Sequence, residues 1–419
     1  MKESIEKIEQ LTPNKPQGIL KSIGKALKRG FVTFLTSLII VGTAATIAGN
    51  IQLKDYSSSA QVQQLSEEFG ADMGYAYEKF GIHSRMQHNG DEPIYVCFNE
   101  ELPSESRASA IKSLDYLFGL VGQINPAYRY EIVSQEEFDR IWMKTKIYYE
   151  FGEHENAEAH IVHSYNPLSL FTSKPAMQGY EVRQSKAYNF ENLDYIYLHE
   201  LLHAFGIDDV YTQGPDAVTN KFQGNTSINS NIGYKHPFIT PNDFKLLVAL
   251  YAPKFENAQE QAKQTARLQQ MIEVYTKHYY EDLSVIYKET FKIDEHLEKQ
   301  DFNFTLDSTF LGAEQTEYNY TYDITLQGDS YAFKLYDDKH NLLDSCNGKV
   351  YWNNDVAFLQ DVTLKEGLYP GWKDHCFSGG YVQDFAFIKR NGKICFANFV
   401  AETYWEGKDI TFLDEELER

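Results

Sequence analysis

The sequence predicts an α+β protein in which an N-terminal transmembrane helix precedes a domain of mixed strands and helices, a helical linker and a C-terminal antiparallel β domain. An uncharged apolar run covers residues 31–53. Helical and strand-like hydrophobic spacing alternates over residues 91–252, and spacing with a period of two dominates residues 301–419. The 419 residues also exceed one ordinary domain of ~100–200 residues, so several units are expected.

The charge balance argues against nucleic acid as a partner. The chain holds 39 Lys and Arg residues against 60 Asp and Glu residues, a net charge of −21. Residues 1–30 carry +4 and the rest of the chain carries −25. A body this acidic has no cationic excess with which to neutralise phosphates, so no nucleic-acid binding is expected. Hydrophobic residues make up 42% of the chain, which supplies a sizeable core and excludes global disorder.

Residues 31–53 form the expected transmembrane anchor of a single-pass membrane protein. The run is close to the ~20 apolar residues that a helix needs to cross the hydrocarbon core. Basic residues precede it, so the positive-inside rule places residues 1–30 in the cytoplasm as a basic tail and residues 54–419 outside. The alternative is a signal peptide cleaved near the small residues 45–48, which yields a secreted protein. The long polar lead and the long apolar run favour the anchor.

Residues 54–90 are expected to form a stem and residues 91–252 the main folded domain. The stem has helical spacing over residues 59–80 and a turn signal at residues 88–93. The expected strands of the main domain cover residues 94–98, 130–133, 145–151, 160–165 and 178–184. The expected helices cover residues 104–122, residues 189–205 with Asn189 as N-cap, and a stretch after Thr240 in which Thr240 is the N-cap and Pro241 the first helical residue.

Residues 253–300 are expected to form a helical linker, because apolar side chains recur at helical spacing along a polar segment. Residues 301–419 alternate apolar and polar positions and are rich in aromatic residues, which predicts a separate antiparallel β domain. Asn391-Gly392 is a strong hairpin signal, and Asn347-Gly348 is a second candidate. This accessory domain is a candidate surface for a substrate or a surface partner.

The chemistry of the chain is concentrated in residues 199–209, which read His-Glu-Leu-Leu-His-Ala-Phe-Gly-Ile-Asp-Asp. His199 and His203 are four residues apart on one predicted helix, so their rings project side by side. Two neutral imidazoles at this separation can hold one Zn²⁺. Glu200 lies beside the first ligand and can act as a general base on a metal-bound water.

A catalytic zinc needs three protein ligands and one open position. Gly206 stands where the end of a helix favours positive φ, so the chain can fold back beneath the metal. Asp208 and Asp209 follow it and offer carboxylates for the third ligand.

Residues 199–209 resemble the extended motif H-E-x-x-H-x-x-G-x-x-[HD] of the metzincin zinc metallopeptidases, in the snapalysin-like branch where Asp replaces the third His. The resemblance implies His199, His203 and Asp209 as zinc ligands and Glu200 as the catalytic residue. It also implies a metzincin-like catalytic domain, with a mixed sheet and an active-site helix, over residues 91–252. Strand 94–98 with its following helix, and segment 226–251, are similar to the first and last parts of a matrixin-like domain.

One position departs from that pattern, because the clan has a methionine in a turn beneath the zinc. No Met lies between Met177 and Met271, and Asn229 takes the aligned position.

The function implied by the resemblance is that of a membrane-anchored zinc endopeptidase acting on protein or peptide substrates outside the cytoplasm. Two alternatives remain open. One is a catalytically silent surface binding protein on a metallopeptidase scaffold, and the other is a zinc hydrolase of a non-peptide amide. The presence of Glu200 favours catalysis, because a scaffold needs at most the histidines.

The four cysteines are too few for a disulfide scaffold. An external location would permit one disulfide among Cys346, Cys376 and Cys395, and Cys97 is expected to be a buried thiol.

Overall fold

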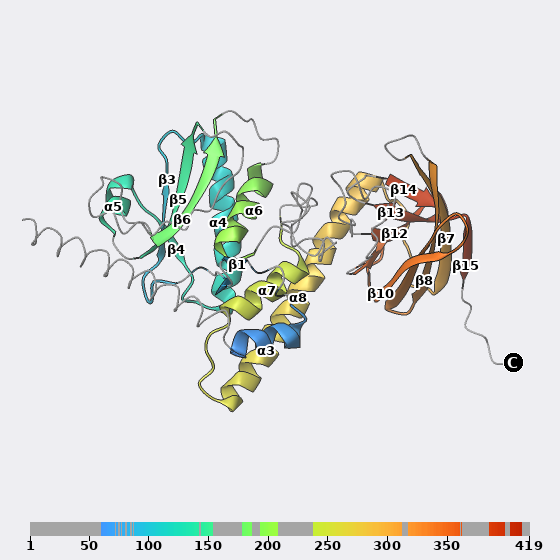
Figure 1. Ribbon diagram of the computed structural model, residues 1–419, viewed down its shortest axis with the longest axis horizontal. Coiled ribbons are helices and arrows are strands. Elements are labelled where there is room, and N and C mark those ends of the chain that lie inside the picture. The colour runs from blue at the N-terminus through green and yellow to red at the C-terminus, as the bar shows by residue number, and fades with distance from the viewer. Residues whose placement is uncertain are drawn as a thin grey trace, which may run out of the picture.

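The computed structural model shows two folded units joined by one long helix (Figure 1). The structure describes residues 60–71, 88–141, 144–153, 178–186, 193–207, 238–311, 317–360, 385–398 and 403–412, together with Val362 and several positions between 73 and 86.

The first unit holds short strands and helices that alternate along the chain. In order they are α3 (Ala60–Phe69), β1 (Glu78–Lys79), β2 (Ile82–His83), β3 (Ile94–Phe98), α4 (Ser104–Ile124), β4 (Tyr130–Ile132), α5 (Gln135–Arg140), β5 (Thr145–Gly152), β6 (Gln178–Ser185), α6 (Leu193–Ala204) and α7 (Pro241–Tyr251). The predicted strand 160–165 and the predicted N-cap Asn189 lie outside the described residues. The predicted stem helix is shorter than expected, because Gly70 with φ +62° ends α3.

The first unit contains a four-stranded sheet in the order β4-β3-β5-β6, and every neighbouring pair is parallel. Consecutive strands that run in the same direction need a crossover connection, which α4 supplies from β3 to β4 and α5 supplies from β4 to β5 on the other side of β3. The predicted α+β class with a mixed, metzincin-like sheet is therefore wrong for the described residues, whose first unit is α/β. Hydrophobic spacing identifies a strand but does not carry its direction.

Helices cover both faces of this sheet. On β3, Ile94, Val96 and Phe98 are buried with residues of α4 and α6, whereas Cys97 is buried with residues of α5. Burial on both faces explains the continuous apolar run of β3. Burial also raises the pKa of the Cys97 thiol to about 11, so it stays protonated at neutral pH. Lys146 on β5 is fully buried and donates from Nζ to the carbonyls at the end of α5, those of Phe138 (2.6 Å) and Ile141 (2.7 Å).

The long helix α8 (Ala258–Phe291) belongs to the cores of both units. Leu268 and Ile272 in its first half pack into the core of the first unit. Leu283 and Tyr287 in its second half pack against β strands of the second unit. The helix predicted within residues 253–300 is thus present over Ala258–Phe291, and its apolar stripe buries two different surfaces. The division of the chain at residue 300 stays a prediction.

Tyr275 of α8 also fixes the start of α7. The backbone N–H of Ile239 donates to the Tyr116 hydroxyl (3.2 Å), and the Tyr275 hydroxyl donates to the Ile239 carbonyl (2.8 Å). The two hydroxyl oxygens are 2.7 Å apart, so Tyr116 supplies the proton of the bond between them. Thr240 and Asp243 then form the reciprocal capping box that begins α7, as the sequence predicts for Thr240.

The second unit is a nine-stranded antiparallel sheet in the order β14-β13-β12-β11-β10-β9-β8-β7-β15. Its strands are β7 (Phe302–Leu311), β8 (Glu317–Gln327), β9 (Ser330–Tyr336), β10 (Leu342–Trp352), β11 (Val356–Leu359), β12 (Phe385–Arg390), β13 (Lys393–Asn398), β14 (Thr403–Glu406) and β15 (Asp409–Phe412). The two edge strands, β14 and β15, are separated in the chain only by Gly407 and Lys408. Because two residues span so short a distance, the sheet must curl until its edges nearly meet.

The strands of the curled sheet that face α8 are buried on both sides. On β12, Phe385 and Phe387 point into the sheet's interior, whereas Ala386 and Ile388 face α8. The same alternation on β11 and β13 gives these strands their unbroken apolar sequence.

One of the two predicted hairpin turns is confirmed. Asn391 (φ 51°) and Gly392 (φ 75°) join β12 to β13 with positive φ at both positions. The turn predicted at Asn347-Gly348 is wrong, because both residues lie inside β10 and pair with β9. Gly348 is needed there for space, since a Cβ would come within 2.5 Å of the Tyr331 ring.

The prediction of a single-pass membrane protein is contradicted. Within the described ranges, no helix has both the length and the apolar character needed to cross a membrane. The helix α8 has 34 residues, but polar and charged residues are spread along it. The run 31–53, on which the prediction was based, lies outside the described residues.

We predict that Leu283→Ala destabilises the protein by about 2–5 kcal/mol, because it leaves a hole between α8 and the curled sheet. Val285→Ala is the matched control on the same helix, since Val285 is 56% exposed, and its effect should stay within about 0.5 kcal/mol. Chemical denaturation followed by circular dichroism measures both. Equal, small effects would show that α8 contributes nothing to the second core.

Candidate metal centre

The helix α6 is held against the rest of the first unit by contacts along its length. At its first turn, Lys112 of α4 forms a salt bridge with Asp194 at 2.5 Å. In its middle, the Tyr197 hydroxyl donates to the Gln184 side chain of β6. At its end, the rings of Phe118 and Phe205 meet edge to face with centroids 5.1 Å apart. The predicted helix 189–205 is therefore present over Leu193–Ala204, and its position is set by α4 and the sheet.

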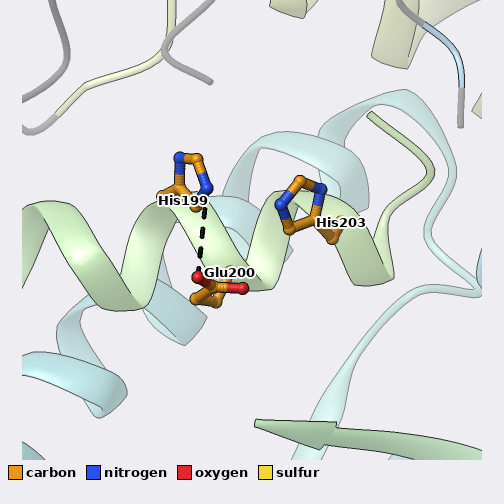
Figure 2. Close-up of side chains that lie close together, drawn as sticks. All are labelled: His199, Glu200 and His203. Atoms are coloured by element: carbon orange, nitrogen blue, oxygen red, sulfur yellow. Dashed lines mark ion pairs between the residues drawn. The ribbon is translucent and has the colours of Figure 1, made fainter. Parts of the chain in front are cut away.

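Three side chains of α6 come together as the motif predicts (Figure 2). One potential ligand atom from each of His199, Glu200 and His203 lies within 4.8 Å of the others. The two imidazole rings are 4.9 Å apart at an interplanar angle of 87°. His199 is 6% exposed and Glu200 8% exposed, while His203 is half-buried. Two imidazoles and a carboxylate gathered in a largely buried place are groups that could hold a metal ion.

A hydrogen bond selects the ring nitrogen of His203 that would face a metal. His203 Nδ1 lies 2.8 Å from the Ile207 carbonyl oxygen, which can only accept, so Nδ1 must carry the proton. His199 Nδ1 lies 3.3 Å from the Tyr195 hydroxyl, which can either donate or accept, so this contact holds the ring without fixing its tautomer. In His203 the tautomer leaves Nε2 as the basic nitrogen. A protonated Nδ1 bonded to an oxygen is the arrangement that orients metal-binding histidines in general.

A tight turn at the end of α6 places the Ile207 carbonyl beside His203. Gly206 has φ +92°, the positive value that its position after the helix predicts. Its N–H donates to the His203 carbonyl (3.0 Å), and the Ile207 N–H donates to the Leu202 carbonyl (3.1 Å). These two bonds define a Schellman motif, which reverses the chain at a helix end. Leu202 and Ile207 are fully buried, as the hydrophobic contact of that motif requires.

Glu200 projects from the same helix beside the first histidine (Figure 2). Its Oε1 lies 3.9 Å from His199 Nε2. A carboxylate in this position can hydrogen-bond a water held between the two histidines and can accept its proton.

Sequence reasoning identified the residues brought together here but missed those that orient them. Tyr195 was visible at the position four residues before His199, which is the spacing for a contact on one helix face. The role of the Ile207 carbonyl could not be found from the sequence, because every residue carries this backbone group. Asp208 and Asp209 lie outside the described residues, so Asp209 as third ligand stays a prediction.

Comparison of the chain with protein-family models, with curated proteins and with solved structures gives no match. These comparisons therefore show no family for the chain, and the resemblance to metzincins stays a prediction from the sequence motif.

We predict that Gly206→Ala weakens zinc binding about 10–100-fold, because a side chain at positive φ displaces the Ile207 carbonyl from His203. Gly70→Ala is the matched control. Gly70 has φ +62°, and it ends α3 with the same pair of bonds, Gly70 N–H to Glu67 and Ala71 N–H to Ser66.

Both variants should lose about 1–2 kcal/mol of stability, but only Gly206→Ala should lose zinc affinity. Thermal unfolding and chelator competition measure the two quantities. A Gly206→Ala protein that binds zinc as tightly as Gly70→Ala would refute this role of the turn.

Proposed function

We propose that the protein is a zinc-dependent hydrolase that cleaves peptide bonds in protein or peptide substrates. The observation that supports this most is the arrangement on α6, where two histidines with oriented rings and a buried carboxylate lie within 4.8 Å of one another. His199 and His203 would hold the metal, His203 through Nε2, and Asp209 is the proposed third ligand. Glu200 is the proposed catalytic residue.

Each residue has a separate task in this proposal. With zinc bound, the site has a Lewis acid that lowers the pKa of a coordinated water and polarises the scissile carbonyl. Glu200 accepts a proton from the attacking water and then delivers it to the nitrogen of the leaving amine. An amine is a poor leaving group until it is protonated, so a carboxylate that serves first as base and then as acid suits amide cleavage. The burial of Glu200 places this transfer in surroundings where water screens little.

The burial of Glu200 also favours catalysis over the silent binding protein. A buried carboxylate is costly unless nearby groups compensate it. A scaffold that only held a metal would need the histidines and could place an apolar residue at position 200. The hydrolase of a non-peptide amide uses the same groups, and peptide and amide substrates distinguish it from a peptidase.

We predict that Glu200→Gln keeps zinc and loses hydrolysis by about 10²–10⁴-fold, because glutamine cannot accept the proton. Zinc content by elemental analysis and cleavage of an unstructured protein measure the two properties. Glu136→Gln, on the exposed surface of α5, is the control and should retain both. Zinc bound by the wild type without cleavage of any peptide or amide would leave the binding protein as the better reading.

We predict that Asp209→Ala lowers zinc affinity by a large factor, whereas the neighbouring Asp208→Ala does not. The spacing after Gly206 motivates this choice of ligand. Chelator competition on both variants decides it. If Asp208→Ala releases the zinc and Asp209→Ala retains it, the ligand is Asp208 instead.

A further inference from the structure

We propose that Tyr251, at the end of α7, is a positioning residue for the metal centre, fixing the turn at the end of α6 whose carbonyl orients His203. The inference rests on the proposed zinc site. Tyr251 is 46 residues from Phe205 in the chain and is fully buried. It acts on the site through the backbone of that turn.

The Tyr251 hydroxyl joins two backbone groups. It accepts a hydrogen bond from the Met86 N–H (3.0 Å) and donates one to the Phe205 carbonyl (2.9 Å). Because the proton of the hydroxyl is used toward Phe205, the direction of both bonds is fixed. The carbonyls of the last helical turn lack partners within a helix, so this bond satisfies one of them with a side chain from another element.

The Phe205 carbonyl belongs to the peptide group that enters Gly206. Gly206 has φ +92° and the next residue, Ile207, carries the carbonyl that accepts from His203 Nδ1 at 2.8 Å. Fixing the plane of the Phe205–Gly206 peptide therefore limits where the Ile207 carbonyl can point. On the far side, Ile207 forms a β-bridge with Ala76, so the turn is held at both of its ends.

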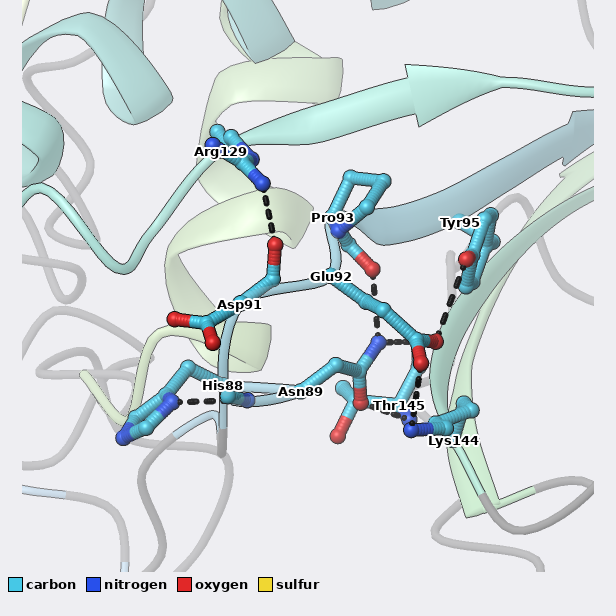
Figure 3. Close-up of polar contacts among 10 residues, drawn as sticks. His88, Asn89, Asp91, Glu92, Pro93, Tyr95, Arg129, Lys144 and Thr145 are labelled. Atoms are coloured by element: carbon cyan, nitrogen blue, oxygen red, sulfur yellow. Dashed lines mark hydrogen bonds and ion pairs between the residues drawn. The ribbon is translucent and has the colours of Figure 1, made fainter.

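Met86, whose N–H donates to the Tyr251 hydroxyl, is itself held in place by its surroundings. Met86 is fully buried, and its carbonyl accepts from the Tyr128 hydroxyl at 3.0 Å. The predicted turn at residues 88–93 follows it, and there Asn89 accepts from the Thr145 N–H (2.7 Å) and donates to the Pro93 carbonyl (2.7 Å) (Figure 3). Met86 is thus a fixed point from which Tyr251 can hold the end of α6.

The substitution Tyr251→Phe removes the hydroxyl and keeps the ring. The ring packs edge to face on Tyr128 at 4.7 Å and lies 5.6 Å from Phe205, and phenylalanine retains both contacts. Tyr331→Phe is the matched control. Tyr331 of β9 is 3% exposed and its hydroxyl donates to the Gln360 carbonyl (2.9 Å) within the second unit, a bond that involves neither Met86 nor α6.

The test measures zinc affinity by chelator competition, the absorption spectrum of the Co²⁺ form, and the unfolding temperature of the metal-free protein. We expect both variants to lose similar stability. Only Tyr251→Phe should bind zinc about tenfold more weakly, near the lower end of the effect of groups that orient metal ligands, and should change the Co²⁺ spectrum. If either variant is poorly folded, sucrose stabilises both and the comparison is made there.

Equal zinc affinities and equal Co²⁺ spectra for the two variants would overturn the positioning role while leaving the zinc site intact. Failure of the wild-type protein to bind zinc would overturn the proposed function, and this inference with it. The two failures are therefore distinguishable from the wild-type measurement alone.

Discussion

The hydrogen bond from the His203 ring to the Ile207 carbonyl connects the candidate chemistry of this protein to its fold. A histidine can present either nitrogen, and only a fixed acceptor decides which one faces a metal. Here the acceptor is a backbone carbonyl, so the ligand is oriented by the shape of the chain itself. That shape depends on Gly206, because the reversal of the helix end needs the positive φ that glycine adopts without strain.

The same dependence extends outward through α7 and α8. Tyr275 on α8 and Tyr116 on α4 hold Ile239 at the start of α7, and Tyr251 at its other end reaches the turn after α6. The second half of α8 packs on the curled sheet. One set of buried tyrosine hydroxyls therefore joins the long helix, and through it the second unit, to the region of the clustered histidines. A bifunctional side chain suits this task, because its ring fills the core and its hydroxyl satisfies a backbone group.

Local features of this structure could be predicted from the sequence, and long-range ones could not. The strand at Ile94–Phe98, the capping of α7 and the turn at Asn391-Gly392 all follow from residues that are close in the chain. The parallel arrangement of the strands in the first sheet does not follow from them. Two strands are parallel when the segment between them returns the chain to the same end of the sheet, and nearby residues do not determine this. The turn predicted at Asn347-Gly348 failed for a related reason. The glycine there makes room for a ring from the neighbouring strand, and only the register reveals that need.

The meeting of His199 and His203 could be predicted and the fold class could not. The first depends on residues close together in the chain, and the second depends on residues far apart. His199 and His203 meet wherever the helix forms, since four residues of helix bring two side chains onto one face. A metallopeptidase fold requires a particular sheet as well, and the four strands described in the first unit are all parallel, unlike the mixed sheet that the resemblance implied. A shared motif can thus occur on a different architecture, and zinc chemistry would depend on the ligand atoms, their tautomers and the carboxylate beside them. The motif does not specify Tyr195 or Ile207, yet Tyr195 holds the ring of His199 and the Ile207 carbonyl leaves Nε2 of His203 as the basic nitrogen.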